Sequence, residues 1–273
     1  MKFKQIVPHL DGIPYTSPHK GRVFYDFVMD TRPEQCLELG FAHGVSSCYI
    51  AAALHELGRG HLTTVDLLES REWFDPTIET LLARTGLERY VTVARETTSY
   101  TWFLKKKIEQ QTSGHLCVPC YDYCFIDGCK NWTHDGAAFF MVDKLLRPGG
   151  WIMFDDLWWT SAREEARTGL KTAAGVPHDQ LADDEYREAH VEAIFRLLVM
   201  QHPAYARFRV LDEILALAQK TSGDTKQIRF ESMVSLKYKL VSLVKKLSGR
   251  SRKQRFSHRP SQPAPGGPPP VAP

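Results

Sequence analysis

The sequence of 273 residues contains no apolar run as long as the 18 or more residues of a membrane-spanning helix. Its first seven residues are followed by Pro8, His9 and Asp11, which interrupt any signal-peptide core. Cysteines number only six, and a chain of this length needs no disulfide to hold a core together. We therefore expect a water-soluble, cytoplasmic protein with reduced thiols.

The chain also has little net charge, but its charges are unevenly placed. The formal net charge is +3, from 35 basic and 32 acidic residues. Nine of the basic residues lie in 237–273, which contains no acid, so the remaining 26 face all 32 acids, a net of about −6. The predicted folded body is acidic, which disfavours binding to the phosphates of a nucleic acid.

Short apolar runs alternate with longer amphipathic stretches through the middle of the chain, a pattern typical of a parallel sheet covered by helices. The predicted strands are Gln35–Leu39, His61–Leu67, Tyr90–Ala94, Tyr123–Asp127, Trp151–Asp155, Arg207–Leu211 and Ile214–Ala218. The predicted helices are Ser46–Leu57, Pro76–Thr85, Tyr100–Gln110, Gly136–Leu146 and Glu185–His202. We expect one α/β domain over residues 1–225.

The last part of the chain has a different composition. Residues 226–249 predict a basic amphipathic helix, and 250–273, rich in proline, predict a disordered tail. For the basic segment three interpretations stay open: an exposed or dimer-packing helix, a peripheral membrane contact, and a nucleic-acid contact. A homodimer is one expectation from the first of these.

Four cysteines, Cys117, Cys120, Cys124 and Cys129, have spacings that can suggest a zinc site. Cys124 lies inside a predicted buried strand and Cys129 just beyond it. This placement suits a compact four-ligand site poorly, so we do not favour zinc.

The first predicted strand ends in a glycine-rich turn, E-L-G-F-A-H-G-V-S over residues 38–46. Glycines at a strand-to-helix turn let the backbone approach a ligand, and the helix start offers N–H groups to it. The G-x-x-x-G spacing, with Glu38 ahead of it, differs from the G-x-G-x-x-G of dinucleotide sites. Asp66 ends the second strand, where a carboxylate can bind ribose hydroxyls.

This pattern resembles the binding site of class I S-adenosylmethionine-dependent methyltransferases, over roughly residues 20–220. The resemblance implies a Rossmann-like, seven-stranded, mostly parallel sheet with helices on both faces. It also implies that S-adenosylmethionine is held by Glu38, Gly40, Gly44, Ser46, Asp66, Thr97, Thr98 and Asp127.

Three carboxylates end the fourth and fifth predicted strands: Asp127, Asp155 and Asp156. The carboxyl ends of parallel strands line one crevice, so we expect these side chains to converge. Carboxylates that lie so close repel one another unless they share a cation, and an all-oxygen site suits Mg²⁺ or another divalent ion.

The segments F-I-D-G-x-K and L-L-R-P-G-G-W-I-M-F-D-D resemble metal-dependent O-methyltransferases of the catechol and macrolide or sugar types. The resemblance implies Asp127, Asp155 and Asp156 as metal ligands and Lys130 as general base, with His134 as an alternative base. Asp156 departs from the asparagine of the catechol enzyme and agrees better with enzymes that methylate natural products. A neighbouring metal is expected to lower the pKa of Lys130.

We therefore expect a Mg²⁺-dependent O-methyltransferase that acts on a hydroxyl of a small molecule or glycoside. Tyr15, Trp158 and Trp159 are candidates for the acceptor side, and residues 160–184 for a lid. Three alternatives stay open: a metal-independent methyltransferase acting on nitrogen or RNA, a nicotinamide-binding oxidoreductase, and a binding module without catalysis.

Overall fold

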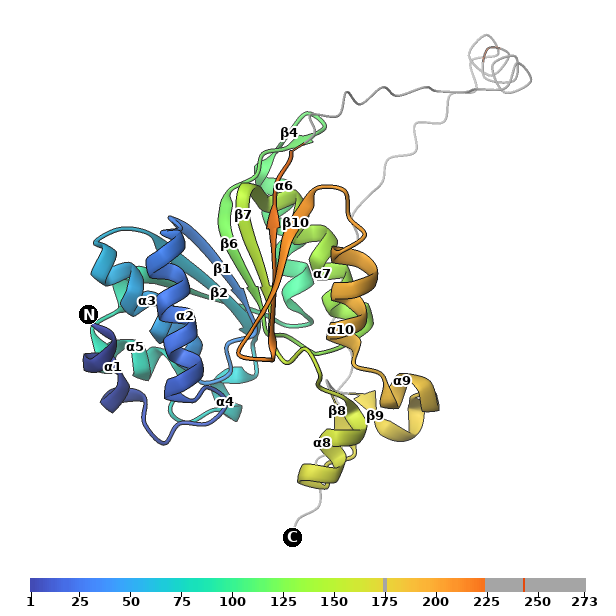
Figure 1. Cartoon of the computed structure of the whole chain (residues 1–273), viewed down its shortest axis with the longest axis horizontal. Coiled ribbons are helices and arrows are strands. Elements are labelled where there is room, and N and C mark those ends of the chain that lie inside the picture. The colour runs from blue at the N-terminus through green and yellow to red at the C-terminus, as the bar shows by residue number, and fades with distance from the viewer. Residues whose placement is uncertain (174–175, 224–242, 244–273) are drawn as a thin grey trace. The chain divides into compact units, whose positions relative to one another are not determined.

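Seven strands form the central sheet of the protein, seen in a computed structural model that describes residues 1–173, 176–223 and Leu243 (Figure 1). Five of them are parallel, and the antiparallel pair β10 and β11 completes one side in the order β10-β11-β7-β6-β1-β2-β3. The strands are β1 (Gln35–Leu39), β2 (His61–Leu67), β3 (Val91–Glu96), β6 (Tyr121–Ile126), β7 (Leu146–Phe154), β10 (Tyr205–Leu211) and β11 (Leu215–Lys220). The predicted fold class is confirmed.

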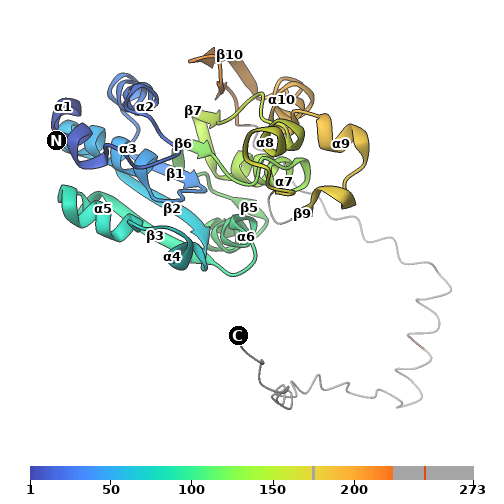
Figure 2. The same cartoon turned by 90° about the horizontal axis from the view of Figure 1, so that it is seen from below.

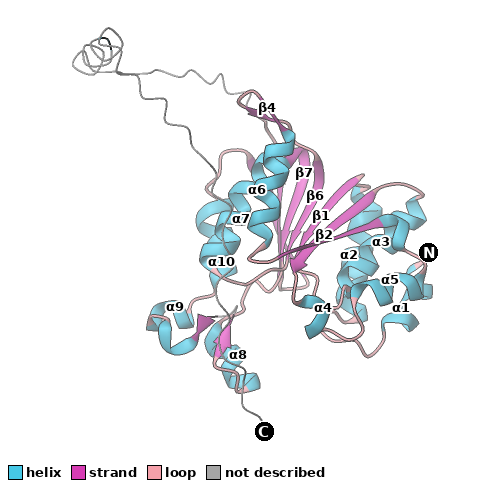
Figure 3. Ribbon diagram, turned by 180° about the vertical axis from the view of Figure 1, so that it is seen from behind, coloured by secondary structure: helices cyan, strands magenta, loops and turns pink. Residues whose placement is uncertain are grey.

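Helices cover both faces of this sheet, as Figures 2 and 3 show. Alternate side chains of the strands pack into two separate apolar cores, one on each face, as the period of two in a strand requires. One core is closed by α1 (Phe3–Leu10), α2 (Pro18–Thr31), α3 (Val45–Leu57) and α5 (Ile78–Thr85). The other is closed by α6 (Tyr100–Gln111), α7 (Trp132–Leu145) and α10 (His190–Ile194).

The smaller elements lie in the connections. They are α4 (Ser70–Trp73), the 3₁₀ turn η1 (Glu88–Tyr90), α8 (Ser161–Thr168), the 3₁₀ turn η2 (His178–Gln180), α9 (Asp183–Arg187) and the π-helical turn η3 (Phe195–Val199). Two short hairpins add β4 (Thr112–Ser113) with β5 (Leu116–Cys117), and β8 (Thr172–Ala173) with β9 (Val176–Pro177). The segment predicted as a lid thus holds α8 and one of the hairpins.

The prediction of one helix over Glu185–His202 is wrong. The structure has α9, α10 and η3 there. α9 is separated from α10 by Glu188 and Ala189, whose ψ angles of 142° and 88° are not helical, and α10 continues directly into η3. The break lets the ring of His190 bond at both nitrogens, to the carbonyl oxygen of Glu185 (2.8 Å) and to the backbone N–H of Trp132 (3.2 Å). Tertiary hydrogen bonds therefore outweigh the local helical preference.

Helix α2 was not among the predicted helices, although its ends carry ordinary signals. The hydroxyl of Ser17 accepts from the backbone N–H of Lys20 (3.2 Å), and Pro18 occupies the first helical position. The helix ends at Arg32 in the left-handed conformation. This helix brings Lys20 to the carboxyl edge of the sheet.

No helix among the described residues is long and apolar enough to cross a membrane. The predicted helix over 226–249 and the predicted tail over 250–273 lie outside the described residues, apart from Leu243. Their domain boundaries and roles stay predictions.

Candidate active site

A pocket of about 530 Å³ lies where the carboxyl ends of β1, β2, β6 and β7 meet. Parallel strands deliver their following loops to one edge, which is where open α/β sheets bind ligands. The pocket is lined by residues from these loops and from the start of α2: Tyr15, Lys20, Gly40, Phe41, Ala42, Asp66, Leu67, Trp73, Phe74, Thr98, Ser99, Tyr100, Asp127, Gly128, Cys129, Lys130, His134, Asp155 and Asp156.

Most of the predicted site residues line this one pocket, although they come from distant parts of the sequence. They are Tyr15, Gly40, Asp66, Thr98, Asp127, Lys130, His134, Asp155 and Asp156. Six other predicted residues are not in the lining: Glu38, Gly44, Ser46, Thr97, Trp158 and Trp159. The first group thus comes together at one site, and the second lies outside the lining of this pocket.

Gly40 shows why the turn after β1 requires glycine. Its φ is +86°, and a Cβ at this position would lie 2.2 Å from the carbonyl oxygen of Asp127. The two strand ends are also joined by a hydrogen bond from Asp127 N–H to the carbonyl of Leu39 (2.8 Å). The turn therefore packs directly against the first of the three aspartates.

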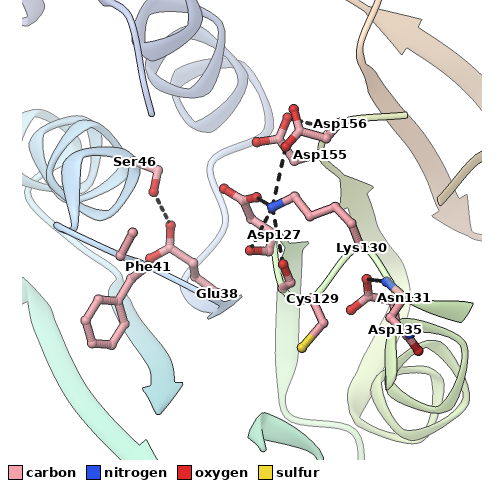
Figure 4. A network of polar contacts seen from close by, with 12 residues as sticks. Glu38, Phe41, Ser46, Asp127, Cys129, Lys130, Asn131, Asp135, Asp155 and Asp156 are labelled. Atoms are coloured by element: carbon pink, nitrogen blue, oxygen red, sulfur yellow. Dashed lines mark hydrogen bonds and ion pairs between the residues drawn. The ribbon is translucent and has the colours of Figure 1, made fainter. Parts of the chain in front are cut away.

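Glu38 lies beneath the turn and is fully buried. Its carboxylate accepts from the hydroxyl of Ser46 (2.6 Å), as Figure 4 shows, and from those of Thr64 (2.6 Å) and Ser47. Burial raises the pKa of Glu38, and the three hydroxyl donors act against this. In the structure Glu38 ties β1 to β2 and to the first turn of α3, so it orders the glycine-rich turn from below.

Asp66 lines the pocket and also fixes the turn from the side. Its Oδ2 accepts from the backbone N–H groups of Phe41 (3.0 Å) and Ala42 (2.9 Å), and its Oδ1 from that of Leu67 (2.7 Å). Asp66, which is expected to bind ribose, thus also stabilises the conformation of the glycine-rich turn through these hydrogen bonds.

Asp127, Asp155 and Asp156 converge as the sequence predicts. Each offers a carboxylate oxygen, and these oxygens lie within 4.8 Å of one another (Figure 4). Asp155 is buried, and burial together with the charge of Asp127 raises its pKa to about 6. Burial likewise raises the pKa of Asp127. Among the described residues this is the one group of His, Cys, Asp or Glu placed to hold a metal, and it contains no cysteine.

Two ammonium groups pair with the carboxylates of this cluster. Nζ of Lys130 lies 2.5 Å from Oδ1 of Asp127 and 3.4 Å from Oδ2 of Asp156, as Figure 4 shows. Nζ of Lys20 pairs with Oδ2 of Asp155. Burial lowers the pKa of Lys130, but the three carboxylates more than offset this and raise it above its ordinary value. The carboxylates thus raise the pKa of Lys130, whereas a bound metal is expected to lower it.

Lys20 is a site residue that the sequence analysis missed. It lies 135 positions from its partner Asp155 and belongs to no motif, so only the docking of α2 against the sheet brings the two together. Its side chain is 11% exposed, and a lysine buried to this degree requires a partner.

Four residues other than glycine adopt positive φ around the pocket: Tyr15 (75°), Ala42 (48°), Lys130 (52°) and Asp156 (54°). Side chains disfavour this conformation by about 1–2 kcal/mol each. Strained backbone of this kind is concentrated at functional sites, where the surrounding structure holds it in place. These backbone positions therefore mark the pocket as a place where the fold sustains local strain.

The loop from β6 to α7 is fixed by a buried pair, Tyr100 and Asp135. The hydroxyl of Tyr100 donates to Asp135, whose other oxygen accepts from the N–H of Asn131 (3.2 Å), and the hydroxyl itself accepts from the N–H of Cys129 (3.3 Å). These bonds position Lys130, which lies between them.

His134 lies at the start of α7, and its backbone N–H donates to the capping side chain of Asn131 (3.3 Å). Nδ1 of its ring is buried and has no hydrogen-bond partner among the described residues. A buried polar atom without a partner is costly, and His134 is one of the residues that line the pocket.

Aromatic rings cover the other side of the pocket. Tyr15, His43 and Phe74 form a cluster with ring centroids 4.9–6.1 Å apart, and Trp73 beside them is 60% exposed. Trp158 lies outside the lining, where its Nε1 donates to the carbonyl of Glu213 (2.9 Å). Of the three residues expected at the acceptor side, Tyr15 lines the pocket and Trp158 and Trp159 do not, whereas Trp73, which was not predicted, does.

Residues 37–157 match the model of a family described as a methyltransferase domain. The matched segment runs from β1 to the residue after Asp156 and includes the glycine-rich turn, Asp66 and the three aspartates. No curated protein sequence matches the chain.

Solved structures share the fold at low sequence identity. The O-methyltransferase TomG of Streptomyces achromogenes, involved in tomaymycin synthesis and solved with S-adenosylmethionine, is 18% identical, with a TM-score of 0.54 over 81% of this chain and 89% of that one. An O-methyltransferase of Bacillus cereus, solved with S-adenosylhomocysteine, is 20% identical, with a TM-score of 0.52 over 80% and 89%. The methyltransferase PaMTH1 of Podospora anserina, also bound to S-adenosylhomocysteine, is 16% identical, with a TM-score of 0.55 over 80% and 88%. The fold that the resemblance implies is confirmed by these structures, and the family model matches residues 37–157 as a methyltransferase domain.

Proposed function

Because the chain carries a methyltransferase domain with the class I S-adenosylmethionine-dependent fold, we propose that it is an O-methyltransferase that acts on a hydroxyl of a small molecule or glycoside. The observation that carries this proposal is the meeting of the glycine-rich turn with three carboxylates in one pocket. The turn suits a methyl donor, and the carboxylates suit a divalent cation that binds the acceptor oxygen.

The donor side of the pocket fits S-adenosylmethionine. Backbone at Gly40 and Ala42, the carboxylate of Asp66 and the hydroxyl of Thr98 line it, with the ring of Phe74 nearby. These groups offer hydrogen bonds for an amino acid and a ribose, and an aromatic face for a base. When bound, the cofactor supplies a methyl group on a positively charged sulfur, and the acidic pocket favours that charge.

The aspartates fit Mg²⁺ or a similar hard cation. Carboxylate oxygens within 4.8 Å of one another can share one ion, and such ions prefer oxygen ligands. Asp127, Asp155 and Asp156 would hold it. When bound, the ion would stabilise the negative charge that develops on the acceptor oxygen.

In the proposed reaction the acceptor oxygen forms a bond to the methyl carbon while the carbon–sulfur bond breaks. The electron pair stays on sulfur, and the hydroxyl proton passes to a base of the protein. Nζ of Lys130 already donates to Asp127 and to the carbonyl of Gly128 (3.2 Å). Nδ1 of His134 has no partner among the described residues. We therefore assign the proton acceptor to His134 and a charge-balancing role to Lys130.

The acceptor is best matched by a hydroxylated molecule with an apolar face. Tyr15 and Trp73 offer exposed rings at the pocket, and rings of this kind contact the apolar faces of sugars and aromatic compounds. Asp156, where the catechol enzyme has asparagine, favours a natural-product glycoside over catechol. A homodimer and a peripheral membrane contact through residues 226–249 stay predictions.

Binding and product analysis test this proposal. Isothermal titration of the whole chain should give binding of S-adenosylmethionine and none of NAD. Hydroxylated glycosides and catechols, incubated with the chain, S-adenosylmethionine and Mg²⁺, should include a compound that gains the mass of one methyl group. Binding of NAD without binding of the methyl donor would favour the oxidoreductase alternative and contradict the proposal.

A further inference from the structure

The ion pair between Lys20 and Asp155 is among the most buried in the described part of the chain. Their side chains are 11% and 1% exposed. Lys20 lies in the first turn of α2, whereas Asp155 follows β7. The pair thus joins α2 to the acidic cluster.

Both oxygens of Asp155 have partners. Oδ1 accepts from the backbone N–H of Asp156 (2.7 Å), which fixes the turn after β7. Oδ2 accepts from the ammonium of Lys20. A cation that replaces the ammonium as the partner of Oδ2 leaves the backbone hydrogen bond at Oδ1 intact.

The two lysines divide the cluster between them. Lys130 contacts Asp127 and Asp156, and Lys20 contacts Asp155. With three carboxylates and two ammonium groups the cluster carries one negative charge. A divalent cation added to this set would leave one positive charge in excess, and a buried charge without a partner is costly. The ion and the ammonium of Lys20 are thus alternative partners of one carboxylate.

We propose that Lys20 is the resident counter-ion of Asp155 and exchanges with the divalent cation, so that Lys20 sets the metal affinity of the site. This inference rests on the proposed metal site. When the ion takes Oδ2, Lys20 loses its partner, and the start of α2 is no longer tied to the cluster. The segment just before α2 carries Tyr15, which lines the pocket, so metal binding and the shape of the acceptor side become coupled.

Metal binding measured without donor or acceptor tests the exchange directly. The full chain, Lys20→Met and Lys20→Arg are titrated with Mn²⁺ by calorimetry. Lys20→Met keeps the length of the side chain and removes the competing charge, so its Mn²⁺ dissociation constant should fall by about tenfold or more. Lys20→Arg keeps the charge and should bind Mn²⁺ as weakly as the unaltered chain.

Arg22→Met is the matched control. Arg22 lies on the same helix and pairs with Asp26 at the surface (2.6 Å), so its removal deletes a positive charge without touching the cluster. Its Mn²⁺ affinity should stay within about twofold of the unaltered chain, because exposed charges are screened. Equal tightening in Arg22→Met and Lys20→Met would overturn the proposal, since net charge alone would then explain the effect.

Two further outcomes separate this inference from the proposed function. If the unaltered chain binds Mn²⁺ and Lys20→Met binds it equally or more weakly, the exchange is wrong and the metal site stands. If neither protein binds Mn²⁺, both the exchange and the metal site are wrong.

If Lys20→Met does not fold, the exchange can still be tested on the unaltered chain. Buried ammonium groups give slowly exchanging signals in ¹⁵N NMR spectra of lysine side chains, and Lys20→Arg identifies the signal of Lys20. This signal should disappear or move to an exposed position as Mg²⁺ saturates the site. An unchanged signal at saturation would overturn the proposal.

Discussion

Gly40 and Asp127 are in such close backbone contact that no side chain fits between them: a Cβ at Gly40 would lie 2.2 Å from the carbonyl oxygen of Asp127. Because Gly40 belongs to the predicted donor side and Asp127 to the predicted metal side, this contact couples the two halves of the site.

Gly40→Ala should therefore disrupt the site as well as strain the backbone. The positive φ of +86° and the clash together should lower the free energy of unfolding by about 3 kcal/mol and abolish binding of S-adenosylmethionine. Gly86→Ala is the control, because Gly86 has a φ of +66° but nothing within 4 Å of the added Cβ. It should cost about 1 kcal/mol and leave cofactor binding intact. Denaturant unfolding measures the free energy of unfolding, and calorimetry measures the binding of S-adenosylmethionine. Equal effects of the two variants would contradict the claim that the contact between Gly40 and Asp127 leaves no room for a side chain.

Glu38→Gln should change the dependence of stability on pH. Burial raises the pKa of Glu38 above its ordinary value of 4.5, so the native state holds this proton more firmly than the unfolded chain. That contribution to stability is complete below pH 4.5 and is lost as the pH rises through the raised pKa. Glutamine has no such loss, so the stability of Glu38→Gln relative to the unaltered chain should improve from pH 4 toward pH 8. Denaturant unfolding across this range measures the difference.

Glu109→Gln serves as the control for that experiment. The side chain of Glu109 is 61% exposed and lies on α6, where it pairs with Lys105. The stability difference of this variant should change little over the same pH range. If Glu38→Gln behaves like Glu109→Gln, the pKa of Glu38 is not raised in the folded chain.

Tyr100→Phe should loosen the loop that carries Lys130. The variant removes the hydroxyl that donates to buried Asp135, leaving a carboxylate oxygen without its partner, at a cost of about 1–3 kcal/mol. Tyr123→Phe is the control, since that hydroxyl donates only to the sulfur of Met153 (3.2 Å), a weak acceptor. In thermal unfolding, Tyr100→Phe should lower the Tm more than Tyr123→Phe does. A larger loss in Tyr123→Phe would show that the hydrogen bond from Tyr100 to Asp135 is not a main support of the loop.

His134→Gln should reduce turnover without weakening cofactor binding. A positioned base contributes about 10²- to 10⁴-fold, so kcat should fall by a factor in that range while the dissociation constant of S-adenosylmethionine stays within about twofold. His61→Gln is the control, because His61 begins β2 at the opposite edge of the sheet. Unchanged kcat in His134→Gln, with a large loss in Lys130→Met, would return the role of base to Lys130.

The sequence predicted the parts of the molecule whose signals are local. Alternating strands and helices, the glycine-rich turn and the three aspartates at strand ends all follow from residue order and spacing, and the structure brings the turn and the aspartates to one pocket. The carboxyl ends of parallel strands have to meet at one edge, so convergence could be foreseen.

Contacts between distant segments could not be predicted in this way. Lys20 reaches Asp155 only because α2 docks against the sheet, and nothing near Lys20 in the sequence marks it. The three hydroxyls that donate to Glu38 come from two separate elements, β2 and α3. Only the folded chain brings them within hydrogen-bond distance of its carboxylate. The break at Ala189 likewise depends on bonds from His190 to a remote helix.

The metal dependence of methyl transfer tests the central claim most directly. Once an acceptor is found, the initial rate of methylation is measured against free Mg²⁺ after removal of metal with a chelator, for the unaltered chain and for Asp155→Asn. The rate of the unaltered chain should be lost in chelator and should return in a saturable manner as Mg²⁺ is added. The rate of Asp155→Asn should stay low at all Mg²⁺ concentrations. Full methylation by the unaltered chain in chelator, or by Asp155→Asn, would contradict this claim.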